Sequence, residues 1–310
     1  MVAQQMQKVA TIIVTFNRKE LLAICLDAIE QQVYKPAVTY IIDNASTDET
    51  DVWVQTNGYD RKRSSIEFRY VRLPENIGGS GGFHAGLKTA FEAPDNFDAF
   101  WLMDDDGIPD AMQLEKLLMH IDERDYLSPM VIAKENPSKL SFGGSPNVAD
   151  FVAKADNLGL VDNVAFPFNG VLYSRKLVEM VGYPVKELFI WGDEVNYQLR
   201  CLEKGFVPAV VTDAIHIHPA DRQTPEIILR NLKVTIPAQD WKLYCYVRNR
   251  IYNLRTLATL KHFVGDTCRL LFRYTIYFTF YSFDWRRLGI VCRAMWDGFR
   301  KDLSRLDNYR

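Results

Sequence analysis

Apolar and polar positions along the first hundred residues alternate between short apolar runs and longer amphipathic stretches. Runs rich in β-branched and aromatic residues predict four strands, at 9–14, 38–42, 66–71 and 99–103. Helical spacing predicts helices after the first and the third of them, at 21–29 and 83–91. Each predicted strand ends in a polar loop, and this order is typical of an α/β fold with a mostly parallel central sheet. In such a sheet, ligands bind beyond the carboxyl ends of the strands.

The end of this domain is expected in a proline-containing stretch at 230–240, beyond which the sequence becomes helical, aromatic and basic. We therefore predict an α/β domain over 1–235 and a helical C-terminal region over 236–310. The longest apolar run of that region, at 270–281, is interrupted by Arg273 and is shorter than the roughly 20 residues of a spanning helix. Three interpretations stay open: the region packs on the first domain, packs on a second copy of the chain in a homo-oligomer, or lies on a membrane surface.

Composition and charge narrow the class of protein. With 310 residues, 48% of them hydrophobic and 25% charged, the chain is expected to be globular. A net charge of −2 argues against a nucleic-acid-binding protein. Residues 241–310 nevertheless hold 14 basic against 5 acidic side chains, so the rest of the chain carries a charge of −11. A basic tail suits an anionic surface, and an acidic domain needs a cation to hold a polyanionic ligand.

Cysteine usage and the first residues bear on the cellular compartment. The five cysteines are scattered and odd in number, which is typical of free thiols in a reducing environment. The first ten residues contain no apolar run of signal-peptide length. We therefore expect a cytoplasmic protein.

The run Asp104-Asp105-Asp106, directly after the fourth predicted strand, carries the most chemical information. Three adjacent carboxylates repel one another strongly unless a cation lies among them. Their hard oxygen atoms suit Mg²⁺ or Mn²⁺, and such an ion could bridge them to a diphosphate. The alternative is a solvated acidic turn in which Asp110 caps the next helix.

A glycine-rich segment, Gly78-Gly79-Ser80-Gly81-Gly82, lies between the third predicted strand and the helix that follows it. Glycine permits positive φ angles and close backbone approach, so this loop could bring amide groups up to a phosphate or a sugar. Its spacing matches neither a dinucleotide-binding fingerprint nor a P-loop. The alternative is a flexible turn.

Two further motifs carry candidate chemistry. Asp193-Glu194 follows Trp191 at the start of an amphipathic stretch. An acid beside an aromatic wall can act as a general base with a raised pKa, whereas the alternative is a favourable charge at a helix N-terminus. His216 and His218 occur in a strand-like run and share one face, so the pattern does not decide which of them could complete a metal shell.

Taken in order, the motifs resemble those of the family 2 inverting glycosyltransferases of the GT-A fold, and within that family they most resemble the galactofuranosyltransferases. The motifs are Thr15-Phe16-Asn17-Arg18, Asp43-Asn44-Ala45-Ser46, the segment 76–83, Asp104-Asp105-Asp106, Trp191-Gly192-Asp193-Glu194 and His218. The resemblance runs from about residue 9 to Arg250, ending in Val247-Arg248-Asn249-Arg250. It implies a metal-dependent, inverting hexosyltransferase that transfers galactofuranose from UDP-galactofuranose to a hydroxyl of a glycan or lipid-linked glycan in cell-surface polysaccharide synthesis.

The resemblance also implies roles for individual residues. Those implied to bind the nucleotide sugar are Thr15, Phe16, Asn17, Arg18, Asp43, Asn76, Gly78, Gly79, Asp104 and Asp105. Those implied to hold Mn²⁺ or Mg²⁺ are Asp104, Asp106 and His218, with His218 preferred over His216 because it keeps the family's distance from 205–206. Glu194 falls at the position of the catalytic base, with Asp193 as the alternative acid. Trp191 and Asn169 would line the acceptor site.

Two other functions stay open. One is the same chemistry with dTDP-rhamnose as donor, which would make the protein a rhamnosyltransferase. The other is a scaffold or binding protein that keeps the GT-A fold without catalysis, since a fold does not fix a function. Family members extend lipid-linked glycans at the cytoplasmic face, so the resemblance also implies a peripheral position at the inner face of the cell membrane.

Overall fold

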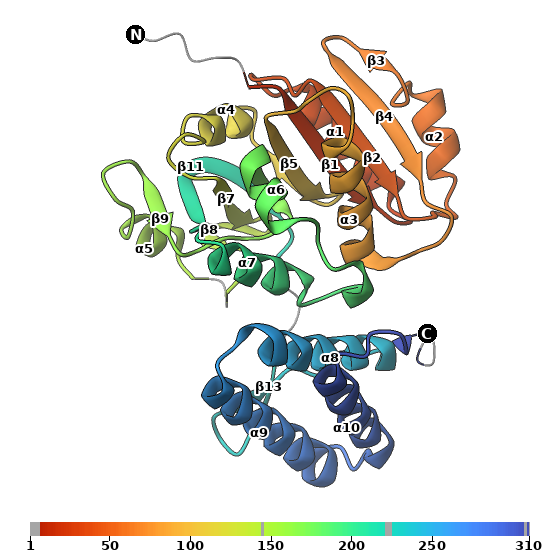
Figure 1. The fold of residues 1–310 in the computed structure, drawn as a ribbon, viewed down its shortest axis with the longest axis vertical. Coiled ribbons are helices and arrows are strands. Elements are labelled where there is room, and N and C mark those ends of the chain that lie inside the picture. Colours follow the sequence, from red (N-terminus) through yellow and green to blue (C-terminus); the bar gives the residue numbers. More distant parts are fainter. Residues whose placement is uncertain (1–6, 144–145, 221–224, 307–308, 310) are drawn as a thin grey trace. The chain divides into compact units, whose positions relative to one another are not determined.

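The computed structural model describes residues 7–143, 146–220, 225–306 and 309. Two compact units divide the chain, each with a hydrophobic core of its own (Figure 1). The N-terminal unit comprises Met1–Lys186 and Arg200–Asp221, and the C-terminal unit comprises Glu187–Leu199 and Arg222–Arg310. This division differs from the expected boundary at 235/236, because the segment 187–199 is hydrogen-bonded to a helix of the C-terminal unit.

The first half of the sheet in the N-terminal unit is parallel. Strand β1 (Val9–Thr15) lies between β2 (Val38–Asp43) and β5 (Ala99–Asp104), and β2 pairs with β4 (Ile66–Arg72). These are the four strands that the sequence predicts, each longer by one residue at its carboxyl end. The expectation of a mostly parallel α/β core is confirmed.

The second half of the sheet brings a further carboxyl end to the same edge. Strand β10 (Asn169–Ser174) is antiparallel to both β5 and β7 (Tyr126–Ala133), and β11 (Ala209–His218) is parallel to β7. The shorter strands are β3 (Lys62–Arg63) on β4, β6 (Ile108–Pro109) on β11, β8 (Asn136–Leu140) on β7 and β9 (Leu160–Asp162) on β11. Because β5 and β11 run in the same direction, Asp104 and His218 end their strands at one edge of the sheet.

Helices cover both faces of this sheet. Helices α1 (Lys19–Glu30) and α4 (Gln113–Leu118) form a core with Val9 and Ile13 of β1, whereas α3 (Gly78–Phe91) packs on Ile12 and Val14 of the opposite face. Since β1 is buried on both faces, its sequence is apolar without alternation. The remaining helices are α2 (Thr50–Thr56), α5 (Val148–Val152), α6 (Arg175–Val181) and α7 (Asp193–Glu203), which crosses from one unit into the other along the chain.

Helix α3 begins at Gly78, so the prediction of a helix starting at residue 83 after a glycine-rich turn is wrong. The glycines form the first turns of the helix instead, although glycine is a poor helix former. The reason is close packing: a Cβ at Gly82 would lie 2.5 Å from Cγ1 of Val14 on β1. Only glycine lets this part of α3 lie directly on the sheet.

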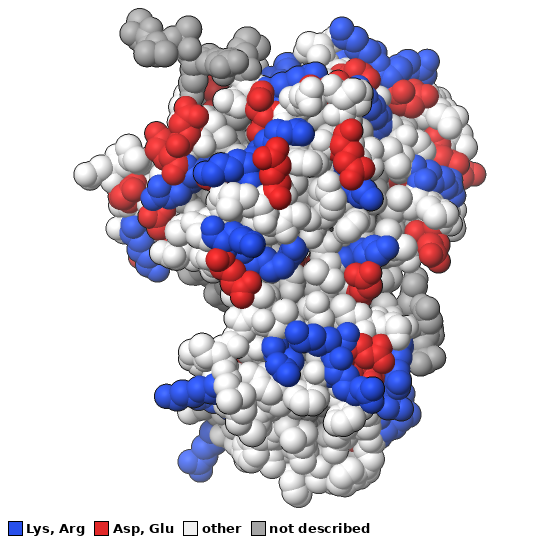
Figure 2. Space-filling model, viewed as in Figure 1, with Lys and Arg blue, Asp and Glu red and all other residues white. Residues whose placement is uncertain are grey.

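The C-terminal unit is helical, as the sequence predicts. Its main elements are α8 (Asp240–Leu257), α9 (Leu260–Ile276), the π-helix η2 (Tyr277–Tyr281) and α10 (Trp285–Arg300). The 3-10 helix η1 (Lys186–Leu188) leads into the unit, and β12 (Glu226–Ile228) and β13 (Leu232–Val234) form a hairpin. Among the charged side chains on the visible face of this unit, basic ones predominate (Figure 2). Within the described residues, no helix is long and apolar enough to span a bilayer.

Candidate active site

The loops that follow β1 and β2 are hydrogen-bonded to each other. The N–H of Asn17 donates to Oγ of Ser46 (2.9 Å), and the N–H of Thr47 donates to Oδ1 of Asn17 (2.6 Å). Asn17 has a φ of +53°, a conformation that Asn adopts more readily than most residues. Phe16, beside it, is 39% exposed. The two loops therefore form one fixed rim at the carboxyl edge of the sheet.

Asp43, at the end of β2, is fully buried, and its carboxylate is engaged inside the protein. It accepts hydrogen bonds from the N–H of Ser46 (2.8 Å) and from the hydroxyl of Tyr70. The structure thus places Asp43 in the support of the loop that carries Ser46. Tyr70 lies within a predicted strand, where nothing in the sequence marks it as part of a site.

Asn44 ties the same loop to the start of α3. Its Oδ1 accepts from the N–H of Ile77 (2.9 Å), and its Nδ2 donates to the carbonyl of Gly78 (2.9 Å). The N–H of Gly78 donates in turn to Oδ1 of Asn76 (2.9 Å). Asn44 is not among the individual site residues predicted from the sequence, although its place directly after a strand is the signal that could have identified it.

The acidic run at the end of β5 meets groups from the loop after β1. The hydroxyl of Thr15 donates to Oδ2 of Asp105 (2.7 Å), and Asp105 is only 3% exposed. The guanidinium of Arg18 donates to Asp105 (3.3 Å) and to Asp106 (3.0 Å). Thr15, Arg18, Asp105 and Asp106, which the sequence predicts as site residues, are brought together.

The three carboxyl groups of this run differ in their pKa values. Burial raises the pKa of Asp105 to about 6, although Arg18 and the Thr15 hydroxyl oppose the shift. Burial and the charges of Asp106 and Asp105 raise the pKa of Asp104 well above its usual range. Burial also opposes ionisation of Asp106, but His218 and Arg18 outweigh it and lower its pKa. The site therefore holds three carboxyl groups beside two cationic side chains, and two of the three carboxyl groups have raised pKa values.

His218, at the end of β11, lies beside the acidic run. Its Nε2 is 3.3 Å from Oδ1 of Asp106, and its Nδ1 donates to the carbonyl of Pro219 (2.7 Å). Burial disfavours the imidazolium, but Asp106 outweighs burial and raises the pKa of His218. A proton on Nδ1 leaves the lone pair of a neutral imidazole on Nε2, on the side of Asp106.

His216 occupies a different environment from His218. It is fully buried, its Nδ1 lies 3.0 Å from Oε1 of Gln113, and burial lowers its pKa to about 3. A Cβ at Gly107 would lie 2.2 Å from its Nε2, and one at Gly170 would lie 2.7 Å from its Nδ1. In this structure His216 fills core space between two glycines.

The donor atoms at this edge fit a divalent cation. Asp106 and His218 offer an oxygen and a nitrogen side by side, and Asp104 adds a carboxyl group whose pKa is raised by burial and by the charges of Asp106 and Asp105. Among the described residues, no three His, Cys, Asp or Glu side chains converge in a preformed metal cluster. Mg²⁺ and its analogues are commonly held by one or two protein ligands plus phosphate oxygens of a substrate, so a partial shell suits them.

Asn169 begins β10 opposite Met103 of β5. Its Nδ2 donates to the carbonyl of Pro167 (2.9 Å), whereas its Oδ1 is buried and has no hydrogen-bond partner within the described part of the chain. The preceding residue, Phe168, accepts from the N–H of Asp104 (3.1 Å) through its carbonyl. The structure thus places Asn169 next to the strand that ends in the acidic run.

The other predicted site residues belong to the C-terminal unit. Asp193 and Glu194 lie in the first turn of α7, where Asp193 is buried and Glu194 is half-buried. The ring of Trp191 lies edge-on to Tyr246, with centroids 6.2 Å apart, and Nζ of Lys242 is 5.7 Å from its centroid. These contacts build an aromatic and cationic surface next to two acids.

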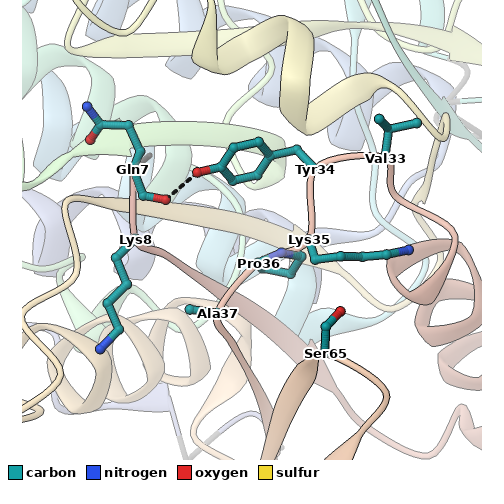
Figure 3. Close-up of a pocket in the computed structure, with 8 residues that line it drawn as sticks. All are labelled: Gln7, Lys8, Val33, Tyr34, Lys35, Pro36, Ala37 and Ser65. Atoms are coloured by element: carbon teal, nitrogen blue, oxygen red, sulfur yellow. Dashed lines mark hydrogen bonds between the residues drawn. The ribbon is translucent and has the colours of Figure 1, made fainter. Parts of the chain in front are cut away.

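A surface hollow of about 540 Å³ lies elsewhere on the N-terminal unit (Figure 3). It is lined by residues that precede β1, β2 and β4, among them Lys8 and Lys35, and the hydroxyl of Tyr34 donates to the carbonyl of Gln7 across it (2.6 Å). It therefore lies at the amino ends of the strands, away from the polar loops at their carboxyl ends.

The chain is similar to known proteins in sequence and in fold. The model of the family described as glycosyl transferase family 2 matches residues 10–177. Galactofuranosyltransferase GlfT1 of Mycolicibacterium smegmatis is 30% identical over 261 residues, which cover 79% of this chain and 82% of the relative. The crystal structure of S. aureus TarS 1-349 in complex with UDP-GlcNAc aligns with a TM-score of 0.58 at 15% identity, over 97% of this chain and 83% of that chain. GalNAc-T7 with UDP, GalNAc and Mn²⁺ aligns with a TM-score of 0.59 at 11% identity, over 81% of this chain and 48% of that chain.

The raised pKa of Asp105 predicts a pH dependence of stability. The folded state keeps the proton up to a pKa of about 6, against about 3.9 for an unfolded chain, so stability falls as pH rises through this window. In Asp105→Asn this loss, on the order of 3 kcal/mol, should be absent. Thermal unfolding in EDTA, from about pH 4.5 to about pH 7.5, should therefore show a shallower decline for the variant. Asp162→Asn, at an exposed position, is the control and should keep the wild-type slope; equal slopes for all three proteins would contradict the prediction.

Proposed function

The chain belongs to glycosyl transferase family 2, and we propose that it transfers galactofuranose from UDP-galactofuranose to a hydroxyl of a glycan or lipid-linked glycan. The family and the galactofuranosyltransferase relatives identify it as a hexosyltransferase. The choice of donor is supported by the GlfT1 similarity, which extends over most of both chains.

The observation that carries the proposal is the cluster at the carboxyl edge of the sheet. Thr15 and Arg18 follow β1, Asp105 and Asp106 follow β5, and His218 ends β11, yet their polar atoms lie within 3.3 Å of one another in a continuous chain of contacts. Carboxylates, a guanidinium and an imidazole at one edge suit a nucleoside diphosphate accompanied by a divalent cation.

In this proposal the donor binds along the rim of the sheet. Phe16, Asn17 and Arg18 contact the uridine, and Asp43 supports that contact by holding the neighbouring loop through Ser46. A second group of residues, Asn76, Gly78, Gly79, Asp104 and Asp105, lies along the diphosphate and the sugar. The amino end of α3 favours this placement, because its first N–H groups and the helix dipole attract negative charge.

The cofactor in this proposal is Mn²⁺ or Mg²⁺, held by Asp104, Asp106 and His218. When bound, the ion supplies positive charge that stabilises UDP as a leaving group. The protein contributes the guanidinium of Arg18 and the hydrogen bond from Nδ1 of His218 to Pro219, which fixes the imidazole that offers Nε2. A structure of GalNAc-T7 that contains UDP and Mn²⁺ supports the choice of ion through the shared fold.

The proposed reaction is a single displacement. The acceptor hydroxyl oxygen attacks the anomeric carbon on the face opposite UDP, and the bond from that carbon to the phosphate oxygen breaks as the new bond forms. Glu194 accepts the hydroxyl proton, with Asp193 as the alternative base, and the configuration is inverted. Trp191 and Asn169 contact the acceptor sugar, for which an indole face next to polar groups is a suitable surface.

The metal ligands give one prediction. Without a divalent ion or without Asp106, UDP leaves unassisted, so EDTA should abolish transfer from UDP-galactofuranose, Mn²⁺ or Mg²⁺ should restore it, and Asp106→Ala should lower turnover by about 10²- to 10⁴-fold. Transfer is measured as the release of UDP from UDP-galactofuranose in the presence of a glycan acceptor. Added dTDP-rhamnose serves as the competing donor, and its use would show as reduced UDP release. Asp213→Ala, at an exposed acid, should keep full activity. An EDTA-resistant enzyme would disprove the metal assignment.

The base gives another prediction. Glu194→Gln keeps the size of the side chain but cannot accept a proton, so transfer should fall by about 10²- to 10⁴-fold while UDP binding, measured by calorimetry, persists. Glu203→Gln, in the last turn of the same helix, is the matched control and should transfer at the wild-type rate. Loss of transfer in Asp193→Asn together with normal turnover in Glu194→Gln would assign the base to Asp193 instead.

We also propose that the C-terminal unit lies on an anionic membrane surface. Three aromatic side chains at the passage from η2 into α10 are strongly exposed: Phe280 by 63%, Phe283 by 71% and Trp285 by 62%. Aromatic side chains next to basic ones are typical of helices that lie in the headgroup region. The segment 241–310 carries nine more basic than acidic residues, so its charge is complementary to anionic lipid. This complementarity favours a membrane surface over packing on the first domain or on a second copy of the chain.

The membrane proposal predicts reversible, salt-sensitive binding. The full-length protein should float with vesicles that contain phosphatidylglycerol, less so in high salt, because each basic residue contributes only about 1 kcal/mol. Changing Phe280, Phe283 and Trp285 together to Ser should reduce flotation several-fold. A triple Ser variant at Val33, Val52 and Leu158, which are similarly exposed on the N-terminal unit, should float like the wild type. Absence of flotation at low salt, or a concentration-dependent dimer that the first variant abolishes, would reject docking in favour of packing.

A further inference from the structure

The loop that leads into α7 has an unusual backbone. Phe189, Trp191 and Gly192 have φ angles of +68°, +58° and +83°. Bulky side chains rarely adopt positive φ, so this conformation persists only where neighbouring groups impose it. The loop presents Trp191 and is followed at once by Asp193 and Glu194, so its shape decides where three proposed functional side chains lie.

Asn249, a fully buried residue of α8, makes hydrogen bonds along this loop. Its Nδ2 donates to the carbonyls of Leu188 (2.8 Å), Ile190 (3.0 Å) and Trp191 (2.7 Å). An amide nitrogen carries only two hydrogens, so one of them is shared between two carbonyls. Its Oδ1 accepts from Nε of Arg248 (2.9 Å), which fixes the orientation of the amide group.

The neighbours of Asn249 extend the same contact in both directions. The buried guanidinium of Arg248 donates to the carbonyls of Glu187 (3.0 Å) and Leu188 (3.2 Å) at the start of the loop. One turn further along α8, Nδ2 of Asn253 donates to the carbonyl of Gly192 (2.7 Å) at its end. The helix thus holds the loop from its first to its last peptide.

Gly192 joins the loop to the helix that carries the two acids. Its carbonyl also accepts from the N–H of Asn196 (2.9 Å), which is a hydrogen bond of the first turn of α7. A Cβ at Gly192 would lie 3.2 Å from Cβ of Asn249, so the glycine lets the backbone pack directly on α8. A shift of this carbonyl would therefore move the beginning of α7.

We propose that Asn249 is a positioning residue for the transfer reaction: its amide holds the loop 187–192 in the conformation that presents Trp191 to the acceptor and sets the direction of Glu194. The inference rests on the proposed function, because it takes the roles of Trp191 and Glu194 from it. Asn249 itself contacts neither substrate in this account. Displacing a base or a binding surface by about 1 Å is enough to lower a rate strongly, because transfer requires aligned reacting atoms.

The test compares two buried changes on the same helix in the full-length protein. Asn249→Ala removes the hydrogen bonds to the loop, whereas Tyr244→Phe removes the hydrogen bond from the buried Tyr244 hydroxyl to Asp297 (2.9 Å) and leaves the loop contacts intact. We expect Asn249→Ala to lower kcat for transfer about 10- to 100-fold and to raise KM for the acceptor, with the Kd for UDP within about twofold of wild type. Tyr244→Phe should lower Tm but keep kcat and KM.

Hydrogen exchange separates this inference from the proposed function. In Asn249→Ala, amides of 187–196 should exchange faster than in the wild type, and in Tyr244→Phe they should not. If Asn249→Ala does not fold, Asn253→Ala takes its place in the test. This change removes the hydrogen bond to Gly192, and it should also speed exchange in the loop and lower kcat, by smaller amounts. A wild type that transfers no sugar would defeat the proposed function, leaving the loop to be judged by exchange alone. Unchanged exchange in the loop, or equal kinetic losses in Asn249→Ala and Tyr244→Phe, would overturn the positioning role.

Discussion

Repulsion among three consecutive carboxylates at the end of β5 sets the requirements for the surrounding structure. Asp105 is stabilised by hydrogen bonds from Thr15 and Arg18, and Asp106 by its contact with His218. None of these three partners is near the acidic run in sequence; they arrive because parallel strands end at one edge of the sheet. The fold therefore collects opposite charges from three segments at one place, and it leaves Asp104 with a raised pKa, which is where additional positive charge has most to stabilise.

Rigidity around this charge comes from backbone and side-chain contacts between loops. Asn17 and Ser46 join the loops after β1 and β2, and Asn44 joins the second of them to α3. Helix α3 can reach that position because Gly82 lets it lie against Val14. A site framed this way does not need to order its loops when a ligand arrives, which lowers the entropic cost of binding.

The sequence predicts the four parallel strands well because each is a short apolar run that ends in polar residues. It misplaces the start of α3, because glycine is read as a turn residue and the close approach to Val14 is a tertiary effect. Strand periodicity cannot distinguish His216 from His218. The difference is visible only in the structure, where His216 is buried between Gly107 and Gly170 and His218 is not. Asn249 lies in the motif with which the family resemblance ends, but its role is not predictable from that motif, because its partners are backbone carbonyls that leave no trace in the residue types.

The interleaved order of the two units along the chain has a consequence for biosynthesis. The segment 187–199 leaves the ribosome well before α8, and Asn249 follows Trp191 by 58 residues. Until α8 has been made, the positive φ angles of Phe189 and Trp191 have no amide to sustain them. The nascent chain can complete most of its sheet first, since β11 is synthesised between the two partners. The loop can thus reach its native conformation only after α8 has been synthesised, later than most strands of the sheet.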